Sequence, residues 1–185
     1  MRNVNRVLAI VALALSLTSA AEPAFGASAK KINQEAHTAL QHLYAKSDAA
    51  RLLSKEAKGI LVFPGIYKAG FIIGGAGGDG VLTKDGHPVA YYRSVAASYG
   101  LQAGVQKFGY ALFFMKDEAL GYLDKSEGWE LGVGPSIVVV DAGVGKSLTT
   151  TTGRSDVYAF IFSQKGLMAG IGIQGSKITK ITPDE

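Results

Sequence analysis

The residues that come nearest to a chemical site are 140–147, where Gly-Lys-Ser follows an apolar run. In a nucleotide-binding loop, backbone amides and the N-terminus of the next helix hold the phosphates. Such a loop begins with a glycine, whereas this chain has Val140. The residues that follow are the threonines 149–152, which favour a strand over a helix. We therefore do not expect this segment to bind a nucleotide.

Two other glycine-rich stretches match ligand-binding patterns only in part. Residues 170–175 have the glycine spacing of a dinucleotide site, but too little chain follows for the βαβ unit and acidic residue that such a site needs. Residues 74–82 match one copy of a calcium-binding repeat, and one copy cannot form a site that lies between stacked repeats. We interpret both stretches as structural, the second as a turn between strands.

The side chains that most often carry catalysis or metals are few and scattered. His37 and His42 are five residues apart on a predicted helix, which puts them off the same-face spacing, and His87 lies at a predicted turn. The chain has no cysteine, which excludes disulfides and thiolate chemistry. It also has no Gly-x-Ser-x-Gly nucleophile motif. We predict a protein that is not an enzyme and holds no metal or cofactor.

The N-terminus has the layout of a secretory signal peptide. Two arginines precede an apolar run at residues 7–15, and small residues suited to cleavage follow at 19–21 and 27–29. The run is short for a membrane-spanning helix, although an uncleaved anchor is the alternative. We predict that residues 1–29 are cleaved and that the protein is exported to the periplasm or cell envelope of a bacterium.

The rest of the chain, residues 30–185, is long enough for one domain with one core. The full chain has a formal net charge of +4, which is mildly basic. That charge suits an anionic surface but lacks the density of a nucleic-acid binder, so we predict no nucleic-acid partner. The sequence leaves the oligomeric state open.

Helical patterns come first in this domain and strand patterns follow. Apolar residues recur at helical spacing over residues 32–46, and Ser47 can cap a second short helix. Short apolar runs separated by glycine follow, the first ending at Pro64, with one helical stretch at 117–124. The pair Asp85 and Gly86 predicts a hairpin turn. We predict an α+β fold in which N-terminal helices precede a large, mostly antiparallel, curved sheet or partly closed barrel.

Three stretches repeat the pattern of glycine, a large apolar residue, two further residues and glycine. They are residues 70–74, 100–104 and 166–170. Residues four apart in a strand point to the same face, so the two glycines of each stretch leave the backbone on that face without side chains. Such glycines mark a sharp bend or the close approach of another backbone or a ligand. We assign structural roles to Gly70, Gly74, Gly100, Gly104, Gly166 and Gly170.

A set of short segments follows one order along the chain, at residues 57–64, 67–71, 74–75, 80–82, 99–104, 134–135 and 162–170. In this order the segments resemble the SYLF domain family. The resemblance covers roughly residues 36–180, and the ordered set is more specific than any single glycine motif.

The resemblance implies a protein that binds acidic lipids. Eukaryotic members of the family bind phosphoinositides, and a yeast member also binds and bundles actin. This chain has a predicted signal peptide and lacks the basic amphipathic leader and partner domain of that branch. We therefore expect acidic phospholipid or phosphoinositide-like headgroups at a membrane surface, and we do not expect actin binding.

Basic residues beside the glycine strips are the predicted lipid contacts. Lysine can meet a headgroup phosphate as a point charge, and each basic residue near an anionic bilayer contributes about 1 kcal/mol. The candidates are Lys68, which lies inside the family motif, and Lys58, Arg93 and Lys107. Two alternatives remain, a small outer-membrane barrel and a structural or partner-binding module of the envelope.

Overall fold

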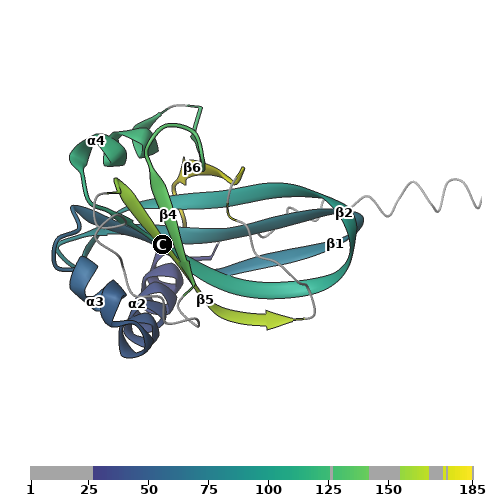
Figure 1. The fold of residues 1–185 in the computed structure, drawn as a ribbon, viewed down its shortest axis with the longest axis horizontal. Helices are drawn as coiled ribbons and strands as arrows, with labels where there is room; N and C mark the ends of the chain where they lie inside the picture. The colour runs from purple at the N-terminus through teal and green to yellow at the C-terminus, as the bar shows by residue number, and fades with distance from the viewer. Residues whose placement is uncertain (1–26, 126, 142–154, 167–172, 174, 185) are drawn as a thin grey trace, which may run out of the picture.

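A computed structural model describes residues 27–184, apart from 126, 142–154, 167–172 and 174. Its helices precede its strands, and the strands form one curled, mostly antiparallel sheet (Figure 1). This confirms the predicted α+β class and the partly closed barrel. The elements are α2 (Ala29–Lys46), α3 (Asp48–Leu53), β1 (Gly59–Lys84), β2 (His87–Phe114), α4 (Asp117–Leu120), the 3-10 helix η1 (Gly121–Asp124), β3 (Trp129–Glu130), β4 (Ile137–Asp141), β5 (Val157–Gly166) and β6 (Lys177–Ile181).

Serines begin both N-terminal helices. The Ser28 hydroxyl accepts a hydrogen bond from the Lys31 backbone N–H at 3.4 Å and caps α2. Ser47 caps α3 as predicted, because its hydroxyl accepts from the Ala50 N–H at 3.2 Å. Cleavage of the predicted signal peptide after Ala29 would remove the α2 cap, whereas cleavage after Ala21 would keep it.

Strands β1 and β2 form one exceptionally long hairpin of 26 and 28 residues. Asp85 and Gly86 make its turn with φ of 50° and 78°, as a two-residue type I′ turn requires. The expected break at Pro64 is wrong, because β1 passes this residue with a register shift between Phe63 and Ile66. Proline is tolerated at such an irregularity, where it takes no ladder hydrogen bond.

The hairpin folds back on itself near its middle. A Cβ atom on Gly78 would overlap the carbonyl oxygen of Gly65, and one on Gly80 would overlap that of Val62. The two halves of β1 therefore lie against each other, with the reversal between them. The expected turn at residues 74–82 is also wrong, since these residues continue β1 into its second half.

Two of the glycine strips meet at this bend. Gly70 pairs with Gly104 and Ile72 with Gly100, with a register shift between the two pairs. Gly74, in the first strip, pairs with Ser98. Gly166 ends β5 opposite Gln106, whereas Gly170 lies outside the described residues. The strips in β1 and β2 thus mark a sharp bend, which is one of the two roles that their pattern predicts.

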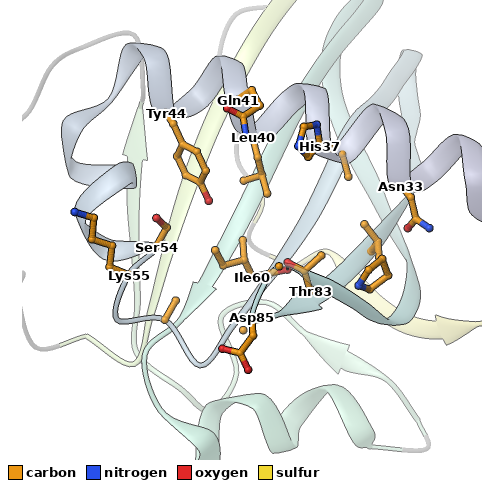
Figure 2. Close-up of a pocket in the computed structure, with 16 residues that line it drawn as sticks. Asn33, His37, Leu40, Gln41, Tyr44, Ser54, Lys55, Ile60, Thr83 and Asp85 are labelled. Atoms are coloured by element: carbon orange, nitrogen blue, oxygen red, sulfur yellow. Dashed lines mark hydrogen bonds between the residues drawn. The ribbon is translucent and has the colours of Figure 1, made fainter.

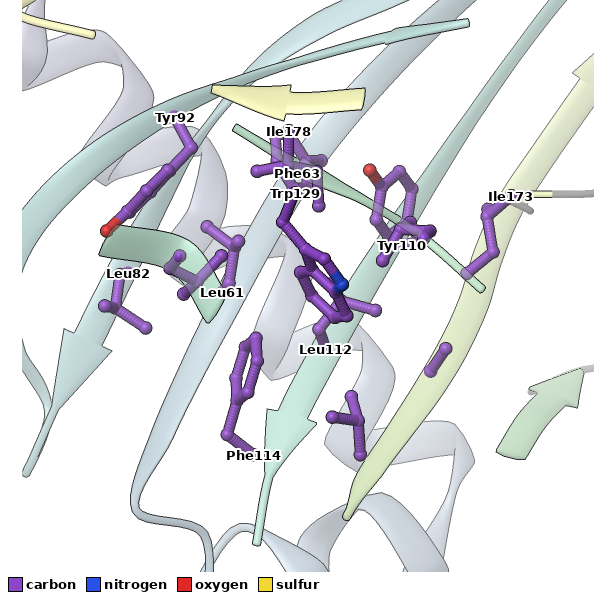
Figure 3. Packing of buried hydrophobic residues seen from close by; sticks show 14 of the residues in the cluster. Leu61, Phe63, Leu82, Tyr92, Tyr110, Leu112, Phe114, Trp129, Ile173 and Ile178 are labelled. Atoms are coloured by element: carbon purple, nitrogen blue, oxygen red, sulfur yellow. The ribbon is translucent and has the colours of Figure 1, made fainter. Parts of the chain in front are cut away.

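The curled sheet encloses the main core and carries α2 on its outer face. Strand order is β3-β6-β2-β5-β4, with β1 also paired to β2. Among the strand pairs of the described residues, only β4–β5 is parallel. Leu61 and Phe63 face the inside, where Trp129 packs among aromatic and aliphatic side chains (Figure 3). Val62, between them, faces outward and joins the cluster under α2 with Ile32 and other α2 residues. This alternation is the period of two expected for a strand buried on both faces.

Candidate functional site

The four basic residues predicted as lipid contacts do not form one cluster. Lys58 precedes β1 at the end of the hairpin remote from the bend, where its backbone N–H donates to the Phe114 carbonyl at 2.7 Å. Lys68 and Lys107 lie close to the bend, on paired strands. Their register decides which face each side chain occupies.

Arg93 is engaged by a carboxylate on the neighbouring strand. Its Nε lies 2.7 Å from Asp79 Oδ1 and its Nη2 lies 3.0 Å from Asp79 Oδ2, so the ion pair is bidentate. The hydrogen bond to Asp79 raises the pKa of Arg93 above its ordinary value. Since the Asp79 side chain is only 12% exposed, this pair is part of the hairpin and adds little net charge to a surface.

Lys107 belongs to a row of exposed side chains that crosses three strands. It is opposite Tyr67 of β1 and opposite Lys165 of β5, so all three side chains project from the same face. The Lys107 Nζ lies 4.8 Å from the centroid of the Tyr67 ring, within cation–π range. Both lysines are exposed.

Exposed apolar surface lies within this row and beside it. Val105, two residues along β2 and on the same face, is 67% exposed, and Tyr67 is 59% exposed. We call Tyr67, Val105, Lys107 and Lys165 the Lys107 patch. Farther along the same hairpin, Ile73 and Val95 are also exposed. The bend therefore combines cationic groups with apolar groups that water solvates poorly.

Lys68 projects from the opposite face of the sheet. It pairs with Gln106, which is 3% exposed and whose Oε1 has no hydrogen-bond partner among the described residues. Lys68 itself is half-buried. The two lysines expected beside the first two glycine strips are thus separated by the sheet.

Sequence reasoning did not assign Tyr67, Val105 or Lys165 to the site. A single lysine with an apolar neighbour is too common a pattern to identify a surface. Only the strand register brings Lys165 beside Lys107, across 58 residues of sequence. No signal within any one segment reveals that row.

Within the described residues there is no cluster of three or more histidine or acidic side chains placed to hold a metal ion. None of the helices in this part of the chain is long and apolar enough to cross a membrane.

Residues 95–183, from within β2 to just beyond β6, match the model of the family described as Ysc84, Las17-binding protein actin regulator. No curated protein matches the chain.

Proposed function

The chain belongs to the Ysc84 (SYLF) family through residues 95–183, and from this premise we propose that it binds acidic lipid surfaces without catalysing a reaction. Its ligand in this proposal is an anionic phospholipid or phosphoinositide-like headgroup. Its place is the bacterial cell envelope, to which the predicted signal peptide would direct it.

The Lys107 patch is the observation that carries this proposal. Lys107 and Lys165 are exposed on one face, where they can approach headgroup phosphates. Tyr67 lies on the other side of Lys107 from Lys165, and Val105 lies two residues along β2. Such exposed side chains favour the boundary between headgroups and acyl chains. Cationic and apolar contributions act together here, whereas either alone gives marginal attachment.

The shape of the molecule supports contact through the bend. The helices lie at one end of the folded hairpin, and the bend forms the other end (Figure 1). A flat membrane could therefore meet the patch without displacing α2 or α4. In this orientation Lys58 would lie far from the membrane, and Arg93 would keep its ion pair with Asp79.

Vesicle co-sedimentation tests the proposal directly. We expect the protein to pellet with phosphatidylglycerol-containing vesicles at low salt, and to be released as salt rises because exposed charges are screened. Vesicles of phosphatidylcholine alone should bind much less. Equal binding to anionic and neutral vesicles at low salt would contradict an acidic-lipid function.

A further inference from the structure

A separate groove lies between α2 and the turn end of the long hairpin. Its volume is about 570 Å³, within the range typical of small-ligand sites. The walls come from α2, the start of β1, the end of β1 and the hairpin turn (Figure 2). It lies at the opposite end of the hairpin from the Lys107 patch, and it can bind a ligand whether or not that patch binds a membrane.

The middle of the groove is apolar. Leu40 of α2 and Ile60 of β1 lie on opposite sides of it (Figure 2), and Ala36 and Val81 also line it. The Thr83 hydroxyl beside them donates to the Ile60 carbonyl at 3.2 Å, so its hydrogen is already used. An aliphatic chain is the ligand chemistry that such a surface favours.

Polar groups occupy both ends of the groove. Asn33 lies at one end and Tyr44 at the other, eleven residues apart on α2 and hence about 16 Å along the helix axis. Burial raises the pKa of Tyr44, and a hydrogen bond with Ser54 partly offsets this. Asp85 and Lys55 line the rim with opposite charges, so the groove has no overall preference for an anion.

Asn33 has an unused acceptor at the groove. Its Nδ2 donates to the Tyr91 hydroxyl at 2.9 Å, which fixes one side of the amide. Its Oδ1 is buried and has no partner among the described residues. A buried carbonyl oxygen requires a donor, so a group that binds here should offer an O–H or N–H.

We propose that this groove binds an uncharged single-chain amphiphile of the monoacylglycerol class. The acyl chain lies along Ala36, Leu40 and Ile60, and a head hydroxyl donates to Asn33 Oδ1. A fatty acid is the poorer ligand, since its carboxylate offers no donor to Asn33 and the rim charges balance.

The test uses 1-monolauroylglycerol below its aggregation concentration and the chain from Ala27 onward, which contains every described core residue. Two-dimensional amide NMR should show saturable shifts at residues such as Ala36, Leu40 and Ile60. Lauric acid should bind at least tenfold more weakly. Absence of saturable shifts at the groove, or equal affinity for lauric acid, would overturn the proposal.

Matched variants locate the site. His37→Trp places a large side chain over the groove from an exposed position and should abolish binding, whereas Thr38→Trp, on the next exposed residue outside the lining, should not.

Asn33→Leu should weaken binding about tenfold or more. Tyr91→Phe is the control: like Asn33→Leu it removes the hydrogen bond between Asn33 Nδ2 and the Tyr91 hydroxyl, but it keeps the Asn33 Oδ1 acceptor. This variant should therefore bind like wild type. An Asn33→Leu affinity equal to wild type, or equal losses in both tryptophan variants, would contradict the assignment.

Discussion

At the scale of single residues, the described glycines differ in what lies against them. A Cβ atom on Gly80 would overlap the Val62 carbonyl oxygen and the Phe63 ring, both of which belong to the other half of the same strand. Gly121, at the start of η1, has open space where a Cβ would go. The same substitution should therefore have opposite effects at the two positions.

Replacing Gly80 with alanine should lower the free energy of unfolding by about 1–3 kcal/mol, as overpacking against rigid backbone does. Gly121→Ala is the control and should be neutral or stabilise by up to about 1 kcal/mol, because it restricts the unfolded chain. Urea unfolding measures both. A Gly80→Ala protein as stable as wild type would mean that the two halves of β1 do not touch there.

At the scale of elements, local signals predict the cap of α3 and the hairpin turn but not the length of the hairpin. Ser47 and the Asp85–Gly86 pair act through neighbours within a few residues, so their patterns are readable in the chain. Pro64 looks like a strand end because it interrupts an apolar run. In the fold it occupies a register irregularity, and the strand continues.

One acidic residue joins three elements and should give the protein a pH-dependent stability. Asp156, just before β5, accepts from the backbone N–H and hydroxyl of Ser136 at 2.9 and 2.8 Å, and its Oδ1 lies 2.6 Å from Lys116 Nζ. Lys116, followed by the Ser136 hydrogen bonds, lowers the pKa of Asp156 from 3.8 to about 2. The carboxylate is therefore favoured in the folded protein.

Because the folded pKa is lower than the unfolded one, the stabilisation is present above pH 3.8 and is lost as the pH falls towards 2. Urea midpoints measured across this window should fall less steeply for Asp156→Asn than for wild type. Parallel pH profiles for the two proteins would show that the Asp156 contacts contribute nothing to folding.

At the scale of the whole molecule, the fold-back of the hairpin separates two surfaces that the sequence cannot distinguish. Lys68 precedes the first glycine strip by two residues, and Lys107 follows the second by three. By position in the sequence, both are reasonable lipid contacts. The register sends Lys107 to the outer face beside Tyr67 and Lys165, and Lys68 to the inner face beside Gln106. The motifs in the sequence are enough to predict lipid binding in general. They do not predict which residues form a patch, because that depends on contacts between segments far apart in the chain.

The most direct test of a membrane-binding bend compares two double variants with the same change in charge. Lys107→Gln with Lys165→Gln removes both lysines of the patch, and at about 1 kcal/mol each the affinity for phosphatidylglycerol vesicles should fall about 30-fold. Lys46→Gln with Lys84→Gln removes two exposed lysines outside the patch. Its affinity should stay within a few-fold of wild type. Equal losses in the two double variants would contradict the account, because binding would then follow net charge and not the surface at the bend.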